Sequence, residues 1–270
     1  MMTDKLAREK YPFVYETHMH TCEGSQCGQN TGEEMAKAYK SAGYDGIIIT
    51  DHHIGGNCRP DRSLPWDEWV TQFFAGYRNA KATGDKIGLK VFCGWESGFN
   101  ATEFLIYGLD EEWMKKHPEL RDCTVEEQYS IIHSAGGMVI HAHPYRKRFY
   151  IPEIRLFPDF VDGVEAVNAA NSHDGPGSYG YDPKNEMELA NPRAFEYANK
   201  HNLPTTAGSD MHVNHPFVGK SGERLSGMHF EKPLNSINDY IEAVLSHGKT
   251  NDYILCDEIH YFSKTGEILG

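Results

Sequence analysis

Histidines that close short apolar runs are the feature that most constrains how this chain can fold. The runs end in YETHMH, IITDHH, VIHAHP and AGSDMH, and a further run, LKVFCGWE, ends in a glutamate. Each run has the length and composition of a β-strand. Imidazole and carboxylate side chains gathered at strand ends are the ligands that a polynuclear site for zinc, manganese or iron requires. The pattern therefore predicts a fold that brings one end of several strands together around metal ions.

Strand-like and helix-like segments alternate along the chain. The continuous apolar run GIIIT is typical of a strand buried on both faces. The predicted strands are 13–18, 46–51, 89–96, 103–109, 138–143, 161–167 and 203–209, with a possible last strand in the tail NDYILCDEIHYF. The predicted helices are 31–42, 66–82, 125–135, 188–201 and 237–246. This alternation is the pattern of a parallel sheet.

The length of the chain suits one domain. Its 270 residues, 39% of them hydrophobic, are enough for a single α/β barrel over 1–270. The segment 168–185 is the longest irregular stretch and is expected to form a loop over one barrel face. Parallel barrels carry their chemistry at the C-terminal ends of the strands. The histidine clusters fall at those ends, so the pattern and the chemistry predict the same face.

Composition excludes several classes of protein. The net charge of −13 argues against a stable complex with nucleic acid, which relies on a basic surface. Apolar runs stay below the roughly 18 residues of a membrane span, and the start, MMTDKLAREKYPF, lacks the apolar stretch of a signal peptide. Six scattered cysteines without a CxxC pair are expected to be reduced thiols. A cytoplasmic protein is the resulting expectation, with its oligomeric state left open.

The ordered motifs HMH, TDHH, GWE, HAHP and GSDMH resemble those of the PHP (polymerase and histidinol phosphatase) family of metal-dependent phosphoesterases. The resemblance runs from about residue 16 to residue 212, and the following VGK resembles a glycine-bearing loop of that family. No single motif is specific, so the order of all five carries the resemblance. It implies a distorted (β/α)7 barrel, TIM-like, with a metal site at the C-terminal ends of the strands.

The resemblance also implies two or three divalent metal ions, with zinc, manganese and iron all open. It assigns His18, His20 and Asp210 to the first ion. It makes Glu96 the bridge between two ions and places His143 on the second. Side chains at positions i and i+2 leave a strand on the same side, so His18 and His20 can bind one ion together.

The third ion would be held by His52 and His212, and Asp51 is either a further ligand or a partner that orients one. The chain departs from the family at two places. Many members have a histidine or aspartate shortly after the HxH motif, where this chain reads TCEGSQCG. Many also have a histidine before the HP motif, where the segment ATEFLIYG has none. The possible additional ligands are Glu23, Cys27, Glu103 and His141.

Hydrolysis at such a site needs an activated hydroxide and an acid for the leaving group. The predicted catalytic residues are Asp210, as a ligand, and His212 and His53, as candidate acids, with a metal-bound water as the alternative acid. Arg146 follows HAHPY directly and could bind phosphate with both prongs of its guanidinium. The candidates for substrate contact are Arg146, His173 and His215, for which a solvated loop residue is the alternative.

The predicted activity is histidinol-phosphatase-like: hydrolysis of a phosphomonoester or small phosphodiester at a di- or trinuclear site. Histidinol phosphate, a sugar phosphate, a nucleoside monophosphate and a short oligonucleotide all stay open as the small phosphorylated substrate. An amidohydrolase acting on C–N or lactone bonds is an alternative, although those barrels usually add a bridging lysine and only Lys90 lies near such a place. A non-catalytic metal-binding regulatory domain is the other alternative, and it would be expected to lack ligands.

Overall fold

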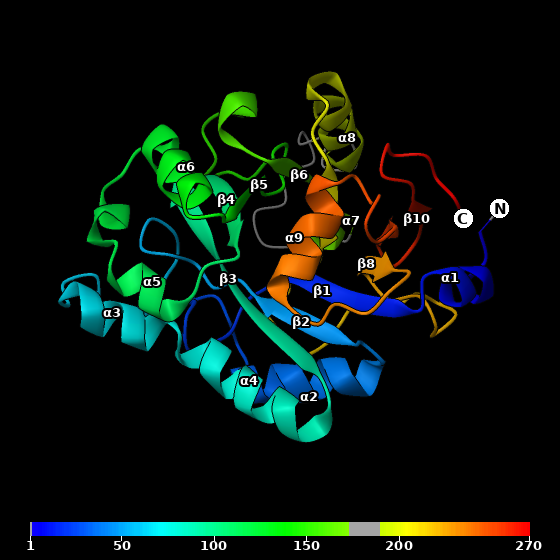
Figure 1. Cartoon of the computed structure of the whole chain (residues 1–270), viewed down its shortest axis with the longest axis horizontal. Coiled ribbons are helices and arrows are strands. Elements are labelled where there is room, and N and C mark those ends of the chain that lie inside the picture. The colour runs from blue at the N-terminus through cyan, green and yellow to red at the C-terminus, as the bar shows by residue number, and fades with distance from the viewer. Residues whose placement is uncertain (1, 173–189) are drawn as a thin grey trace.

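The computed structural model describes residues 2–172 and 190–270, and within them ten strands form one sheet (Figure 1). The strands are β1 (Phe13–Met19), β2 (Gly46–Ile49), β3 (Lys90–Phe99), β4 (Thr102–Tyr107), β5 (Met138–His141), β6 (Gly163–Asn168), β7 (Thr205–Gly208), β8 (Gly227–Phe230), β9 (Tyr253–Cys256) and β10 (Tyr261–Phe262). Their order across the sheet is β10-β9-β8-β1-β2-β3-β4-β5-β6-β7. The α/β class predicted from the alternating segments is confirmed.

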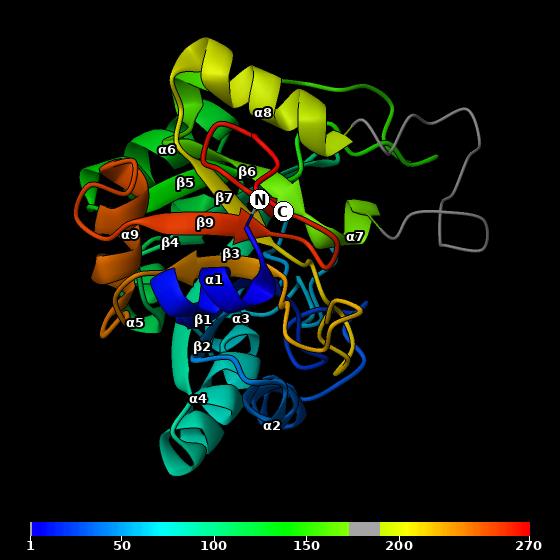
Figure 2. The same cartoon turned by 90° about the vertical axis from the view of Figure 1, so that its right-hand side faces the viewer.

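Helices cover the sheet on two sides. They are α1 (Asp4–Lys10), α2 (Gly32–Ala42), α3 (Trp66–Phe73), α4 (Ala75–Ile87), α5 (Glu111–Lys115), α6 (Val125–Ser134), α7 (Ala169–Ser172), α8 (Ala190–His201) and α9 (Ile237–Leu245), with 3-10 turns at Pro118–Arg121 and Pro158–Phe160. In both views α2 and α4 lie side by side along one side of the sheet, and α6 and α8 lie on the opposite side (Figures 1 and 2). The predicted helix 66–82 is therefore two helices, which meet at Phe74.

The sheet curls until the carboxyl ends of its first and last parallel strands meet. The strands β1, β2 and β3 are parallel to one another, as are β5, β6 and β7. Beyond the end of β1, Met19 forms a parallel bridge with Met211. The amide of His20 donates to the Met211 carbonyl at 2.8 Å, and the amide of Asp210 donates to the His18 carbonyl at 2.8 Å. The residues that follow β7 therefore lie directly beside those that end β1.

One strand runs against the predicted direction. The strand β4 is antiparallel to both β3 and β5, because a two-residue turn, Asn100-Ala101, joins it to β3 without a helix. Both turn residues have positive φ, +47° and +63°, which is the backbone of a two-residue hairpin turn. The strand β8 is likewise antiparallel to β1. The distorted (β/α)7 count that the resemblance implied is therefore not confirmed, although the curled sheet and the convergence of strand ends are present.

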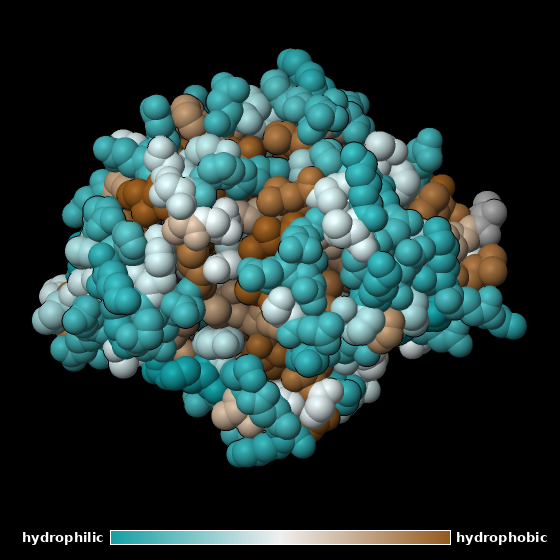
Figure 3. All heavy atoms as spheres, in the orientation of Figure 1, coloured by the Kyte–Doolittle hydropathy of each residue, from teal (hydrophilic) through white to brown (hydrophobic). Residues whose placement is uncertain are grey.

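Hydrophilic side chains cover most of the face shown in Figure 3, and apolar side chains appear in a strip down its middle. Within residues 2–172 and 190–270, no helix combines the length and apolar character that crossing a membrane requires. All six cysteines are free thiols, as expected from their spacing.

Candidate metal centre

Four buried side chains from three strands converge beyond the end of β1. The Nε2 atoms of His18 and His20 lie 3.3 Å apart. Asp210 Oδ1 lies 3.5 Å from the first and 3.0 Å from the second. Glu96, from β3, places one carboxylate oxygen 3.4 Å from His18 Nε2 and the other 3.5 Å from His20 Nε2. The four ligand atoms form one group that could hold a metal ion, as the motif order predicted.

Glu96 also faces a second pair of imidazoles. Its Oε1 lies 3.0 Å from His143 Nε2, and its Oε2 lies 2.8 Å from His52 Nδ1. Glu103 adds a second carboxylate, 3.6 Å from the His143 ring and 3.8 Å from the His52 ring. Glu103 pairs with Gly98 across the β3–β4 hairpin, so its side chain shares a face with that of Glu96 two residues away. The antiparallel strand β4 thus supplies the carboxylate that was only a possible ligand in the sequence.

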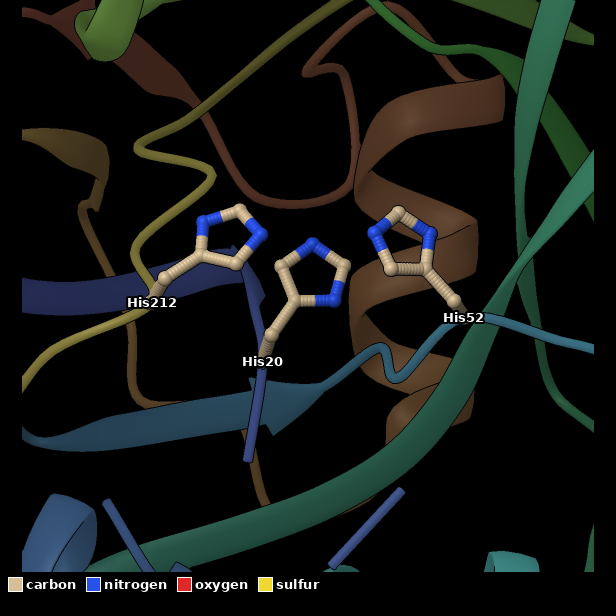
Figure 4. Close-up of side chains that lie close together, drawn as sticks. All are labelled: His20, His52 and His212. Carbon is tan, nitrogen blue, oxygen red and sulfur yellow. The ribbon is translucent and has the colours of Figure 1, made fainter. Parts of the chain in front are cut away.

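A third group consists of His20, His52 and His212, each from a different part of the chain (Figure 4). The ring of His20 lies between the other two, with ring centroids 4.3 Å from His52 and 4.4 Å from His212. Cys27 lies near His52 and His212, and all three line one cleft. Burial raises the pKa of this thiol, but the contacts with His212 and His52 outweigh it and lower the pKa to about 6.

Two of the imidazoles are oriented from behind by hydrogen bonds at Nδ1. His18 Nδ1 donates to Glu165 Oε1 at 2.8 Å, and His20 Nδ1 donates to Ser25 Oγ at 3.2 Å. A ring that donates through Nδ1 presents the lone pair of Nε2 to a metal. Strand register shifts between Glu16 and Met19, where His18 lies, and between Glu165 and Val167, at the partner of His18. Such irregularities re-aim side chains near functional sites.

Glu165 was missed from the sequence. Besides His18, it accepts hydrogen bonds from the amide of His143 at 3.1 Å and from Asn168 Nδ2 at 3.0 Å. It therefore ties two predicted ligands to β6. The signal that could have revealed it is a lone carboxylate inside the apolar strand GVEAVN, since a buried charge needs a partner.

The residues fit a metal ion by their own chemistry. His52 Nδ1 and Glu96 Oε2 are close together, yet neither has a hydrogen-bond partner of suitable geometry among the described residues. Buried polar atoms rarely lack a hydrogen-bond partner. Burial together with the rings of His52 and His212 lowers the pKa of His20 well below its ordinary value, which keeps the ring in the neutral form that binds metals. Burial lowers the pKa of His18 as well, but Glu165, Glu96 and Asp210 outweigh burial and raise this pKa well above its ordinary value. This cluster of carboxylates therefore attracts a cation.

A cleft of about 690 Å³ opens above the three groups. This volume suits a small molecule. The residues that line it are Cys27, Gln29, His52, Asn57, Glu96, Glu103, Arg146, Arg148, Tyr150, Ala170, Asp210 and His212. Arg146 is thus at the cleft as predicted, but its guanidinium is already engaged. Nη1 donates to Asp210 Oδ2, Nη2 to Asn168 Oδ1 at 2.8 Å, and Nε to Asn171 Oδ1 at 3.2 Å.

Two predicted ligands have other roles. Asp51 accepts hydrogen bonds from the amide and hydroxyl of Thr21, both at 2.6 Å, and from Ser25 Oγ at 2.7 Å. It therefore holds the loop behind His20. Glu23 accepts hydrogen bonds from the Gly32 amide at 3.0 Å and from Asn79 at 3.0 Å, so it caps the start of α2. Both carboxylates therefore accept hydrogen bonds from backbone amides instead of serving as metal ligands.

Two predicted histidines lie among aromatic rings. His53 packs edge-on against Trp69 and Phe73, and His141 stacks on Phe104. Burial lowers the pKa of each to about 3. His53 is therefore no acid for a leaving group and His141 no ligand in this structure, because aromatic rings pack against each imidazole.

The two loop histidines give no support to substrate binding. His215 is exposed in the loop after β7, outside the residues that line the cleft. His173 lies outside the described residues.

In the metal-free protein, His53→Phe is expected to reduce the fall in the free energy of unfolding that occurs as the pH drops from about 6.5 to about 3. Unfolded histidine takes up a proton near pH 6.5, whereas folded His53 resists it down to about pH 3. Unfolding therefore consumes a proton between these values, and stability falls as the pH drops through them. Urea unfolding at several pH values would measure the slope. Equal slopes in the two proteins would show that His53 does not resist protonation, and metal content at neutral pH should stay unchanged.

Comparisons with known proteins agree with the fold. Residues 188–220 match a family model described as PHP-associated (PHP_C). A search of the curated proteins found no match.

Three solved structures share the fold. A two-domain protein from Bacteroides vulgatus, containing a predicted PHP-like metal-dependent phosphoesterase, is 16% identical with a TM-score of 0.63, covering 91% of this chain and 64% of that one. PsfC from Pseudomonas syringae is 14% identical with a TM-score of 0.55, covering 90% and 91%. A proposed metal-dependent phosphoesterase from Bifidobacterium adolescentis is 15% identical with a TM-score of 0.50, covering 87% and 96%. This chain thus spans 64% of the length of the first of these proteins.

A curled α/β sheet with imidazole and carboxylate groups gathered at one end of its parallel strands defines the class of this protein. The family-model match and the shared fold confirm the resemblance to the PHP family that the ordered motifs predicted.

Proposed function

We propose that this chain is a metal-dependent phosphoesterase that hydrolyses a phosphomonoester or a small phosphodiester. One observation carries the proposal: Glu96 lies among His18, His20, His52 and His143, at the base of a cleft. A carboxylate that faces four imidazoles with both oxygens is suited to bridge two divalent ions. The names of the B. vulgatus and B. adolescentis structures support the same chemistry.

The described residues suggest which side chains would hold each metal ion and which would orient the ligands. His18, His20, Asp210 and Glu96 would hold one ion, and Glu96, His143 and Glu103 would hold another. Divalent ions bound there supply a hydroxide near neutral pH and neutralise the charge that develops on phosphorus oxygens. Glu165 and Ser25 keep the two rings of the HxH motif aimed at the centre.

Fewer residues are now candidates for the acid that protonates the leaving group. His53 is enclosed by aromatic rings, which removes it. His212 is partly exposed at the cleft, and its Nδ1 donates to the Asp210 carbonyl at 2.8 Å, which fixes the ring. It can act as ligand or as acid but not as both, because a nitrogen that binds a metal ion carries no proton.

The cleft supports a small anionic substrate. Arg148 lines it together with the amide side chains of Gln29 and Asn57, whereas the guanidinium of Arg146 is engaged by Asp210, Asn168 and Asn171. Guanidinium groups bind phosphate oxygens well. Amide groups offer hydrogen bonds to a polar leaving group, such as a sugar or an amino alcohol. A phosphorylated metabolite of modest size is therefore the substrate class we propose.

A substrate panel tests the proposal. Metal-free protein would be reconstituted with Zn²⁺, Mn²⁺ or Fe²⁺ and assayed on a phosphomonoester, a phosphodiester, an amide and a lactone. We expect hydrolysis of a phosphoester only, abolished by EDTA and restored by metal. Cleavage of the amide or lactone with no phosphoester turnover would instead assign the site to amidohydrolase chemistry. Tight metal binding without any turnover would favour a regulatory domain.

A further inference from the structure

Glu16 is a buried carboxyl group that the proposed chemistry does not use. It lies in β1, two residues before His18, and its side chain is fully buried. Within residues 2–172 and 190–270, its oxygens accept hydrogen bonds from backbone amides and from the hydroxyl of Tyr39, and none of these donors is cationic. Burying a carboxyl group without a cation costs free energy that an apolar side chain would not cost. A specific task at this position would explain why the chain keeps a carboxyl group there.

One oxygen of Glu16 joins two segments that are distant in the sequence. Oε1 accepts hydrogen bonds from the amides of Thr17 and His18, both at 3.0 Å. It also accepts one at 2.9 Å from the amide of Ser209, which follows β7 directly and precedes Asp210. A single atom therefore holds the backbone that carries His18 and the backbone that carries Asp210, across 193 positions of chain.

The strand β1 is irregular at the same point. Its register against β2 shifts between Glu16 and Met19. Buried amides need an acceptor, and an irregular strand does not offer them a regular ladder of carbonyls. The side chain of Glu16 supplies the acceptor for the amides of Thr17 and His18. It therefore stabilises the irregularity at the place where His18 turns towards the centre.

The ends of β1 and β7 are packed too closely to move independently. A Cβ at Gly208 would lie 2.4 Å from the Cβ of His18 and 2.8 Å from Glu165 Oε1. Asp210 has a φ of +57°, in the left-handed region that a residue with a side chain seldom adopts. Such a backbone persists only where its surroundings hold it. The hydrogen bond from the Ser209 amide to Glu16 is part of that support.

We propose that Glu16 is a positioning residue, which fixes His18 relative to Asp210 and thereby sets the affinity of the centre for the ion that these two ligands share. Glu165 orients the imidazole of His18, whereas Glu16 holds the backbone from which the ligands project. The hydrogen bonds require an acceptor oxygen at the right distance and do not require its charge. The inference rests on the metal centre of the proposed function, but its test measures bound metal and needs no substrate.

Chelator competition on the full-length protein is the test. Each protein would be loaded with Zn²⁺ and dialysed against a chelator, and the retained ions would be counted by elemental analysis. Glu16→Ala is expected to lower the affinity for the ion at His18 and Asp210 by about 10–100-fold, the usual effect of losing a residue that orients ligands. The ion at Glu96 and His143 should remain, so the variant should retain about one ion fewer per chain.

Two further variants keep the test decisive if Glu16→Ala folds poorly. Glu16→Gln keeps an oxygen that can accept the same three amide hydrogen bonds, so it should retain most of the affinity. Glu16→Asp is one methylene too short to reach the amide of Ser209 but can still serve its own strand, so it should fold and lose affinity for the same ion. Circular dichroism would confirm that the variants are folded.

Asp45→Ala is the matched control. The carboxylate of Asp45 also accepts a hydrogen bond from an amide of β1, that of Val14 at 2.9 Å, but at the opposite end of the strand from the centre. This variant should lower the free energy of unfolding and leave the affinity for both ions unchanged.

The outcomes separate the inference from the proposed function. Natural affinity for the ion at His18 in folded Glu16→Asp or Glu16→Ala would overturn the inference, and so would equal weakening of both ions. A loss in Glu16→Gln as large as that in Glu16→Ala would show that charge, and not position, is what Glu16 supplies. None of these results would contradict phosphoester hydrolysis. A natural protein that binds its ions but cleaves no phosphoester would overturn the proposed function and leave Glu16 as a positioning residue.

Discussion

Asp210→Asn is expected to lower kcat/KM on the best phosphoester by at least roughly 1,000-fold. Asp210 Oδ1 lies 3.0 Å from His20 Nε2 and 3.5 Å from His18 Nε2, so it completes the group that holds the first ion. Losing a residue that merely orients a ligand typically costs about 10–100-fold in affinity or activity, and losing the ligand should cost more. The amide keeps the shape of the carboxylate but removes its charge. His20→Ala should behave similarly, because it removes a ring shared by two ligand groups.

Elemental analysis and steady-state kinetics would measure both effects. Asp85→Asn is the matched control, since it makes the same chemical change on the exposed surface of α4, where Asp85 pairs with Lys81. It should keep normal metal content and rates. Asp210→Asn protein that lost its metal but hydrolysed phosphoesters at the natural rate would show that the reaction does not use this centre.

Arg146→Ala is expected to weaken metal binding as well as raise KM. The guanidinium is buried and holds Asp210 Oδ2, while the other oxygen of that carboxylate faces His20. Removing one partner of a buried ion pair typically costs about 3–5 kcal/mol, because the other charge is left uncompensated. In the metal-free protein, the free energy of unfolding should therefore fall. Metal affinity should drop about 10–100-fold, because Asp210 loses the contact that orients it.

Arg148→Ala gives the comparison for this prediction. Arg148 lines the same cleft, so its loss should raise KM without changing metal content. Arg146→Lys should restore only part of the loss, since an ammonium cannot reach Asp210, Asn168 and Asn171 at once. Chelator competition and urea unfolding would distinguish the roles. A higher KM with unchanged metal affinity and stability would leave Arg146 as a substrate contact only.

Several site predictions needed only the sequence, because they follow from strand geometry. Two residues separated by one in a strand leave it on the same side, and so the HxH motif delivers His18 and His20 to one place. Apolar runs that end in ligands must share an edge if they are parallel strands. That argument brought Glu96, His143 and Asp210 to the centre, and the structure places them within 3.0–3.5 Å of a partner ring.

The tertiary structure was needed to decide which histidine of a neighbouring pair faces the metal centre. Side chains alternate along an extended chain, but the sequence alone does not show which of two adjacent or alternate histidines faces the centre. His52 lies beside Glu96 while His53 packs against Trp69, and His143 faces Glu96 while His141 stacks on Phe104. The same holds for the loop after β1, which could offer Glu23 or Cys27 to the centre.

What the sequence by itself determined is the α/β class and the presence of histidines and carboxylates at strand ends, because both follow from local periodicity and from residue chemistry. The tertiary structure alone decided the direction of β4, which depends on two positive φ values in the Asn100-Ala101 turn and which delivers Glu103. It also decided that Glu165 supports His18 across 147 positions of chain. Contacts between distant segments depend on how the sheet curls and where its register shifts, and those are properties of packing that no local pattern encodes.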